Sequence, residues 1–390
     1  MEIGYLLNSR VPSDNAHVIQ SLKVCDGFVD CGHDVTVLYP DRTQVNEELR
    51  GVDPTAYYDV DPTIQFEPLW YLDINAFTSL LGGEPAPQLT FSRAMFSLCG
   101  AIRSRRSKFD LHYTRGLFIA AVLVALGLPT VLELHEYSHG QWAERAIGQI
   151  GSARHLKGVV TLTEPARDAF VSAGVAPEKV TVEPDAVDLE AYEPHLSKTA
   201  ARNRLELDPL GTYVVYTGSL IAGKGVRTLL KACRDLPVEV LLVGGRDDEQ
   251  AELVQFCDRQ GIENVRFAGR VPPTSVAVYQ QAADVLALPP RADVTNHRHN
   301  PDITSPLKMF EYMAAERPIV ATDLPGIRDV LTHEETALLV APGDAEMLEQ
   351  AIEHLLSNSE LAASLASHAR DAVASYTWDR RCERILSVVT

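Results

Sequence analysis

The residues best suited to chemistry stand together at a predicted helix start. Ser305 and Pro306 indicate that start, because a hydroxyl can cap free amides and proline loses nothing at the first helical position. The amides of Leu307 and Lys308 would then point outward at the positive end of the helix dipole, which suits a phosphate. Glu311, one turn further on, is placed to accept hydrogen bonds from a ribose diol. A capped core helix with an exposed acid would have the same sequence, so both interpretations stay open.

The same stretch continues as a helix and then a strand. Helical spacing of apolar residues predicts one buried face, made of Leu307, Phe310, Met313 and Ala314. We expect Arg317 and Pro318 to end the helix, and the apolar run 319–321 to form a buried strand. A helix that leads into a strand is the repeating step of a doubly wound α/β sheet.

A glycine-rich turn is the second candidate for an anion site. Residues 218–225 follow a predicted strand over 213–217, and they nearly match the phosphate loop Gly-x-x-x-x-Gly-Lys-[Ser/Thr]. The hydroxyl that would hold magnesium is replaced by Gly225, and Asp284 begins its strand instead of ending it. We therefore expect no nucleoside triphosphatase, whereas a glycine turn followed by a helix with Lys224 at its start favours an anion.

His135 is the main candidate in the first half of the chain. It follows a predicted strand over 130–134, and polar residues at the carboxyl ends of parallel strands line the crevice of such folds. A structural histidine after a strand is the alternative. His139 could form a metal pair only with a third ligand, which is not evident, and the adjacent residues 297–299 (His-Arg-His) project apart. We expect no metal site.

Two charged clusters allow a solvated surface or a site. Asp59-Val60-Asp61 matches the Asp-x-Asp of metal-dependent sugar transferases, but a three-residue match in an acidic loop is weak, and we interpret it as surface. The 103–108 basic cluster consists of Arg103, Arg105, Arg106 and Lys108. It is either a solvated helix face or a contact for anionic lipid headgroups or a phosphate-bearing acceptor.

Length and composition limit the class of protein. A chain of 390 residues with 46% hydrophobic residues suits two domains with buried cores. A net charge of −18 argues against a nucleic-acid binder, which needs a basic surface. Only eight of the 35 basic residues are lysines, which favours a halophilic protein over an ordinary acidic one.

Several features favour a cytoplasmic protein. The six cysteines show no Cys-x-x-Cys spacing, which is typical of reduced thiols in the cytosol. No signal-peptide pattern opens the sequence, and the longest apolar run, 117–128, falls short of the roughly 20 residues that span a bilayer. A position at the inner face of the membrane is compatible with these features.

The order of predicted strands and helices indicates two α/β domains. The pattern opens with a strand over 2–7, a helix over 16–31 and a strand over 35–39, but it lacks Gly-x-Gly-x-x-Gly, so no bound NAD is expected. Residues 41–90 are irregular and acidic, and we interpret them as an insertion. A fresh pattern begins at Tyr213 after a polar stretch. We expect domains over 1–188 and 189–375.

The order of several motifs resembles the family 4 retaining glycosyltransferases of the GT-B fold. The segment 305–322, Ser-Pro-Leu-Lys-Met-Phe-Glu-Tyr-Met-Ala-Ala-Glu-Arg-Pro-Ile-Val-Ala-Thr, resembles the signature of that family. Further matches fall in the family's order at 32–38, 133–136, 184–188, 218–225 and 376–378. The resemblance implies two Rossmann-like domains facing each other across a cleft, with a last helix over 376–390 that packs back on the first domain.

The resemblance also implies roles for individual residues. A nucleotide-sugar donor would bind mainly to the second domain, with Glu311 on the ribose and Lys224 on the diphosphate. His135 would reach the donor sugar's 6-hydroxyl. The implied donor-binding set is Gly218, Ser219, Lys224, Arg270, Val271, Asp302, Ile303, Thr304, Ser305, Leu307, Lys308 and Glu311. The loop that closes over the reacting centre would consist of Ser13, Asp14, Asn15 and Ala16, and Arg115 would lie on the acceptor side.

Two positions depart from the family pattern. An acid is common eight residues before Glu311, where this chain has Ile303, so Asp302 or Thr304 would have to contact the transferred sugar. An arginine is common after Gly218, where this chain has Ser219, and Arg291 or Arg298 would have to replace its charge.

The resemblance implies a retaining transfer of a hexosyl group from a nucleotide sugar such as a UDP-sugar, and the lack of an evident metal site in the sequence predicts that this transfer is metal-independent. Its acceptor would be a glycan or a lipid-linked saccharide, and no further cofactor is expected. A nucleotide-sugar epimerase of the same fold and a non-catalytic nucleotide-sugar-binding subunit are the alternatives. An epimerase would need carboxylates placed for deprotonation.

Overall fold

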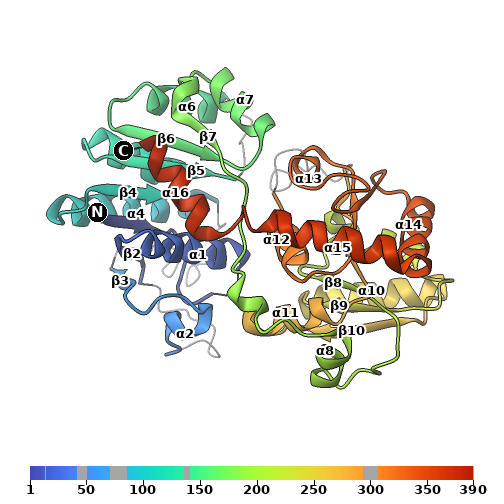
Figure 1. Ribbon diagram of the computed structural model, residues 1–390. Helices are drawn as coiled ribbons and strands as arrows, with labels where there is room; N and C mark the ends of the chain where they lie inside the picture. Colours follow the sequence, from blue (N-terminus) through green and yellow to red (C-terminus); the bar gives the residue numbers. More distant parts are fainter. Residues whose placement is uncertain (14, 42–50, 71–85, 136–140, 293–304, 390) are drawn as a thin grey trace. The chain divides into compact units, whose positions relative to one another are not determined.

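The computed structural model describes the chain except for residues 14, 42–50, 71–85, 136–140, 293–304 and 390 (Figure 1). The described chain divides into two compact units, Met1–Glu183 with Trp378–Thr390 and Pro184–Thr377. Each unit contains a parallel sheet with helices packed on it, which confirms the predicted pair of Rossmann-like α/β folds. The units are described separately below.

Unit 1 is built on a parallel sheet whose described strands have the order β3-β2-β1-β4-β5-β6-β7. The strands are β1 (Glu2–Leu6), β2 (Asp34–Pro40), β3 (Gln65–Leu69), β4 (Leu111–Thr114), β5 (Thr130–Leu134), β6 (Leu156–Thr161) and β7 (Val180–Val182). The helices are α1 (Ala16–Asp30), α2 (Pro54–Tyr58), α4 (Ala86–Arg106), α5 (Leu117–Ala125), α6 (Gln141–Gly151), α7 (Glu164–Ser172) and α16 (Trp378–Val389). A 3₁₀ turn, Pro177–Lys179, precedes β7.

Unit 2 has a parallel sheet with the described order β10-β9-β8-β11-β12-β13. The strands are β8 (Tyr213–Thr217), β9 (Glu239–Val243), β10 (Val265–Gly269), β11 (Val285–Leu288), β12 (Ile319–Thr322) and β13 (Leu338–Val340). The helices are α8 (Lys198–Arg204), α9 (Val226–Ala232), α10 (Asp247–Gln260), α11 (Pro273–Gln281), α12 (Leu307–Ala314), α13 (Pro325–Arg328), α14 (Ala345–Ser357) and α15 (Ser359–Val373). Short 3₁₀ turns cover Glu190–Tyr192 and Ala222–Lys224.

The last helix, α16, belongs to unit 1, where it packs against α1 (Figure 1). The two helices approach closely at Gly27 of α1, because a Cβ atom there would lie 2.6 Å from the carbonyl oxygen of Trp378. The Cys382 thiol also contacts the Val24 carbonyl oxygen at 3.4 Å. The chain therefore returns to its first unit after completing the second.

The sheet of unit 2 is apolar on both faces. Val215 of β8 packs into one core cluster with α12, and its neighbours Val214 and Tyr216 pack into another with α9 and α14. Successive side chains of a strand point to opposite faces, so a strand covered by helices on both sides needs a continuous apolar run. This requirement explains why the short strands of unit 2 were visible in the sequence.

The interpretation of residues 41–90 as an insertion was wrong in part. Strand β3 pairs in parallel with β2 at the edge of the sheet, and α2 precedes it. Only Leu69 of this strand is buried, and the strand contains Pro68. An edge strand needs no continuous apolar run and tolerates proline, which is why periodicity missed it.

Three expectations for the helix of the signature stretch were also wrong. The helix α12 begins at Leu307 with Pro306 as N-cap, and the Ser305 hydroxyl accepts a hydrogen bond from the Asp185 amide at 3.3 Å instead of capping the helix. It ends at Ala314, before Arg317, whose buried guanidinium donates to the carbonyl of Gln281 at 2.9 Å. More than one face is buried, because α12 packs against both β11 and α15.

Candidate functional site

The carboxyl end of β8 brings the glycine turn and the start of α12 together. Gly218 has a φ of +119°, which disfavours other residues, and a Cβ atom there would lie 2.7 Å from Nζ of Lys308. That ammonium lies 3.9 Å from the ring centroid of Tyr216, the residue two before the turn. The glycine is therefore required both by its backbone conformation and by the close approach of the lysine.

Lys224 and Lys308 form an unbalanced pair of cations. Burial lowers the pKa of Lys224, and burial together with the neighbouring charge of Lys224 lowers the pKa of Lys308 well below its usual value. Within the described residues neither ammonium has an ion pair with a carboxylate. The charge of Glu311 opposes these effects at Lys308. Two half-buried ammonium groups beside one carboxylate favour a ligand carrying negative charge.

Glu311 lies one helical turn after this pair and is held by a polar network. Its carboxylate accepts a hydrogen bond from Gln280 Nε2 at 2.9 Å, and the same amide donates to the Thr217 hydroxyl at 3.1 Å. The Thr217 amide donates to the Tyr312 hydroxyl at 2.9 Å. Burial raises the pKa of Glu311, although Gln280 and Lys308 oppose that effect.

Ser219 lies beside an acidic residue, so its surroundings do not resemble a phosphate-binding site. The Glu249 carboxylate of α10 accepts from the Leu220 amide at 2.9 Å and from the Ser219 hydroxyl at 3.4 Å. The Arg291 amide donates to the Gly223 carbonyl at 3.1 Å, which brings the backbone of that arginine beside the glycine turn. Arg298 lies outside the described residues.

The structure describes some of the remaining residues expected to bind the donor, but not all of them. Arg270 is exposed after the end of β10, and Val271 packs against the core. Ser305 is buried just before α12. Asp302, Ile303 and Thr304 lie outside the described residues, so the geometry says nothing of the contact to the transferred sugar.

In unit 1, His135 is attached to a buried acid at the end of β5. Its Nε2 contacts Glu133, whose carboxylate also accepts from the Tyr113 hydroxyl and from Arg381 Nη2, the latter at 3.0 Å. Burial, followed by the charge of Arg115, lowers the pKa of His135 to about 3. The histidine is therefore neutral at physiological pH.

The expected closing loop lies at the start of α1. Ser13 is buried, and its carbonyl accepts from the Tyr58 hydroxyl at 2.6 Å. Asn15 is the N-cap of α1, and Ala16 is its first residue, whereas Asp14 lies outside the described residues. Arg115 donates to Gln20 Oε1 at 2.7 Å, so it lies against α1 as well.

The charged clusters are partly accounted for by local contacts. The carbonyl of Asp59 accepts from Lys23 at 2.6 Å, and the Asp61 carboxylate accepts from the Thr63 amide at 2.7 Å. Arg103 makes a two-pronged ion pair with Glu67 of β3. Arg105, Arg106 and Lys108 remain exposed, without an ion pair among the described residues.

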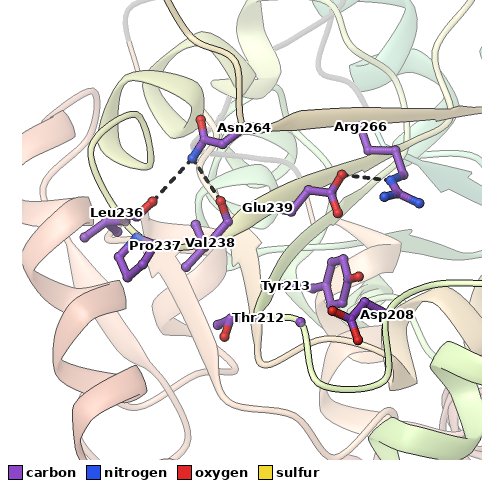
Figure 2. Close-up of a pocket in the computed structure, with 10 residues that line it drawn as sticks. Asp208, Thr212, Tyr213, Leu236, Pro237, Val238, Glu239, Asn264 and Arg266 are labelled. Carbon is purple, nitrogen blue, oxygen red and sulfur yellow. Dashed lines mark hydrogen bonds and ion pairs between the residues drawn. The ribbon is translucent and has the colours of Figure 1, made fainter.

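A hollow of about 520 Å³ lies at the opposite edge of the unit 2 sheet (Figure 2). It is lined by the amino ends of β8, β9 and β10, including Tyr213, Glu239 and Arg266. Arg266 Nε and the Glu239 carboxylate neutralise each other at 2.8 Å. The remaining charged residue of the lining is Asp208, which does not suit an anion, and the hollow is distinct from the site at Lys224 and Lys308.

Sequence reasoning missed four residues that shape these sites. Tyr216, Gln280 and Arg381 belong to no motif, and Tyr312 lies in the signature segment 305–322 but was given no role there. Each acts from an element other than the one it supports. Only the strand-end position of Tyr216 gave a signal. Contacts between elements distant in sequence leave no local pattern.

Within the described residues, no helix has the length and apolarity needed to cross a membrane. The same part of the chain contains no group of three or more histidine, cysteine or acidic residues arranged to hold a metal ion.

Comparisons with known proteins cover both units. Residues 18–186 match the family described as "Glycosyl transferase 4-like domain", and residues 211–358 match "Glycosyl transferases group 1". A D-inositol 3-phosphate glycosyltransferase of Jonesia denitrificans is 27% identical over 227 residues, which cover 54% of this chain and 51% of that protein. One of Rhodococcus opacus is 26% identical over 64% of this chain and 57% of that protein. The chain thus spans little more than half the length of these relatives.

Solved structures share the fold over the whole chain. HepE of Anabaena in complex with UDP has a TM-score of 0.75 at 20% identity and covers 99% of each chain. Sucrose-phosphate synthase of Thermosynechococcus elongatus has a TM-score of 0.75 at 20% identity, covering 99% of this chain and 98% of that one.

Proposed function

This chain belongs to the family 4-like glycosyltransferases of the GT-B fold, and from that premise we propose that it transfers a sugar from a nucleoside-diphosphate sugar to an acceptor hydroxyl. The observation that carries the proposal is the unbalanced pair Lys224 and Lys308 beside the Gly218 turn and the start of α12. Glu311 follows one turn later, at a spacing suited to a ribose next to a diphosphate.

The chemistry follows from the leaving group. Breaking the glycosidic bond to a diphosphate leaves negative charge that must be stabilised as it develops. Lys224, Lys308 and the first amides of α12 supply fixed positive charge for this purpose, in the role that metal ions fill elsewhere. Removing one such group typically costs about 10²–10³ in rate. We propose that the transfer needs no metal.

The proposed roles in unit 1 concern the sugar and the acceptor. His135 would contact the 6-hydroxyl of the donor sugar, and the loop over residues 13–16 with Arg115 would cover the acceptor side. We propose retention of configuration by attack on the same face, with the leaving phosphate taking the acceptor's proton. Glu311 is assigned to the ribose and is not a nucleophile in this scheme.

The comparisons support a more specific donor and acceptor. HepE has been solved with UDP and with UDP-glucose, which favours a UDP-sugar here. The curated relatives are named for an inositol phosphate acceptor, which favours an acceptor that carries a phosphate. We propose a glycan or lipid-linked acceptor bearing such a group.

A surface of α4 fits a lipid-linked acceptor. Leu98 and Ile102 are 45% and 44% exposed, and helical spacing places them on the same face as Arg105. Apolar and cationic side chains on one exposed face suit peripheral contact with an anionic lipid surface. We call Leu98, Ile102, Arg105 and Arg106 the α4 face.

A panel of UDP-, GDP- and ADP-sugars tests the proposal by thermal shift, hydrolysis and transfer to a phosphate-bearing acceptor, each with and without EDTA. Lys224→Met and Lys308→Met should lose donor stabilisation, whereas Lys231→Met, at an exposed lysine of α9, should not. If the parent and the three lysine variants bind the donor equally, the proposed donor site is wrong. Epimerised donor without transfer would indicate the epimerase, and binding without turnover the non-catalytic subunit.

A further inference from the structure

His135 contacts one member of a fully buried ion pair. Arg381 of α16 and Glu133 of β5 both have side chains without solvent exposure, and Nη2 lies 3.0 Å from the carboxylate. The Tyr113 hydroxyl donates to the other carboxylate oxygen. Removing one partner of such a pair leaves an uncompensated buried charge, so the two residues must be considered together.

Arg381 keeps the Glu133 carboxyl ionised. Burial alone would raise the pKa of Glu133, but the guanidinium of Arg381, followed by His135, holds it well below its usual range. The other titratable or charged groups facing the pair are Tyr5, Cys25, Tyr113, Arg115 and Cys382. None of these is a second carboxylate, so the charge of Glu133 is matched directly by Arg381.

Two neighbours of His135 favour opposite tautomers. An ionised Glu133 can only accept, so its contact with Nε2 requires a proton on that nitrogen. The Gln20 amide nitrogen lies 3.1 Å from the same Nε2, and its carbonyl is taken by Arg115 at 2.7 Å. Nε2 of His135 can accept a hydrogen bond from that amide only when this nitrogen carries no proton. The closer and charged contact with Glu133 decides the outcome.

We propose that Arg381, through Glu133, fixes the neutral Nε2–H tautomer of His135 and is thereby a positioning residue for sugar transfer. Nδ1 of the ring is then the nitrogen that accepts a hydrogen bond from a substrate hydroxyl. The inference rests on the proposed role of His135 at the donor sugar. It gives the returning helix α16 a function in the reaction as well as in the fold.

The tautomer can be read directly by ¹⁵N NMR of the full chain labelled at histidine, with the signals of His135 assigned from a His135→Gln variant. In Arg381→Met the Nδ1–H form should gain population and kcat should fall about 10- to 100-fold, by analogy with the range for residues that orient metal-bound histidines. The matched control is Arg384→Met, which removes the 2.8 Å ion pair of the same helix with Glu183 and should change neither.

A rescue variant separates positioning from general damage. Gln20→Leu in the Arg381→Met background removes the amide that competes for Nε2, and should restore part of the Nε2–H population and of kcat. If Arg381→Met does not fold, the charge-balanced double variant Glu133→Gln/Arg381→Met takes its place, with the same gain of Nδ1–H expected.

The parental Nε2–H population in a folded Arg381→Met, or in the double variant, would overturn the inference. The failure of the proposed function would look different: His135→Gln would then transfer sugar at the parental rate, while the NMR result could still hold.

Discussion

The ammonium of Lys308 lies 3.9 Å from the ring centroid of Tyr216, so an aromatic face supports this cation in addition to the charge of Glu311. The Tyr216 hydroxyl donates to the Ser219 carbonyl at 2.7 Å, which fixes the ring against the glycine turn. A cation–π contact is worth about 0.5–2 kcal/mol and leaves the positive charge unneutralised. Lys308 is therefore held in place with its charge available to an anion.

Donor binding should take up a proton at Lys308. Burial and the charge of Lys224 depress the pKa of this amine in the free protein, and a bound diphosphate favours the ammonium and raises it. Between the two pKa values a proton is gained on binding, so affinity should fall as pH rises through the depressed pKa. Calorimetry with UDP in buffers of different ionisation enthalpy measures this uptake.

The Lys308→Met variant is the test of that assignment, with Lys231→Met as control. The parent's amine binds protons less readily when folded than when unfolded, so its contribution to folding stability improves as pH rises. The methionine variant should bind UDP more weakly without proton uptake, and be more stable at acidic and neutral pH. If proton uptake is unchanged in Lys308→Met, the proton is taken up by another group.

Glu311→Gln should weaken donor binding by about 1.5–3 kcal/mol, the range for a hydrogen bond to a charged group. Burial raises the pKa of Glu311, so ionising it costs folding free energy as pH rises through that value. The variant should therefore be at least as stable as the parent at neutral pH while it binds the donor less tightly. Calorimetry and thermal unfolding on the same sample measure both effects.

Glu353→Ala, at an exposed acid of α14, is the matched control and should leave donor affinity unchanged. Parental affinity in a folded Glu311→Gln would remove this carboxylate from the ribose and assign it to the support of Gln280 alone.

The sequence predicted those parts of the fold that local patterns determine. The strand Val285–Leu288, for example, is a buried run with apolar side chains on both faces. The candidate anion site could be predicted because the glycine turn, the lysine and the helix start form local sequence patterns. In contrast, β3 is an edge strand with one buried residue, and its pairing with β2 depends on the rest of the sheet.

Supporting contacts escaped prediction because they join distant segments. Gln280 reaches Glu311 from another helix, and Arg381 reaches Glu133 across 248 positions of sequence. Serine is a common helix cap, but the Ser305 hydroxyl accepts a hydrogen bond from the Asp185 amide instead. Local propensity cannot reveal which of two available partners a side chain contacts in the folded chain.

Thermal stability should increase with potassium chloride up to molar concentrations. A net charge of −18 destabilises the compact state by self-repulsion, and at 1 M salt the screening length falls to about 3 Å. The small number of lysines among the basic residues is also consistent with a protein adapted to high salt. Sodium sulfate at matched ionic strength separates charge screening from the general stabilisation by excluded salts. A melting temperature that stays flat or falls with potassium chloride would refute the halophile interpretation.

The last prediction concerns the α4 face. Charge reversal in Arg105→Glu/Arg106→Glu should lower transfer to a lipid-phosphate acceptor in vesicles and leave donor hydrolysis intact, because these exposed side chains belong to unit 1, whereas the lysine pair belongs to unit 2. Each basic residue near an anionic bilayer contributes about 1 kcal/mol at moderate salt. The control Lys231→Glu/Arg259→Glu makes the same change in net charge on exposed residues of unit 2.

Salt and acceptor length distinguish the two possible contacts of that face. Molar salt screens attraction to a bilayer surface over about 3 Å, so an effect that vanishes there arises from the lipid surface. An effect that persists, and that appears also with a short soluble phosphate acceptor, arises from direct contact with the acceptor phosphate. Leu98→Ser/Ile102→Ser should reduce only the vesicle reaction, since apolar side chains contribute nothing to a soluble phosphate. Equal transfer by the parent and by the Arg105→Glu/Arg106→Glu variant in every arm would show that the basic cluster is a solvated surface.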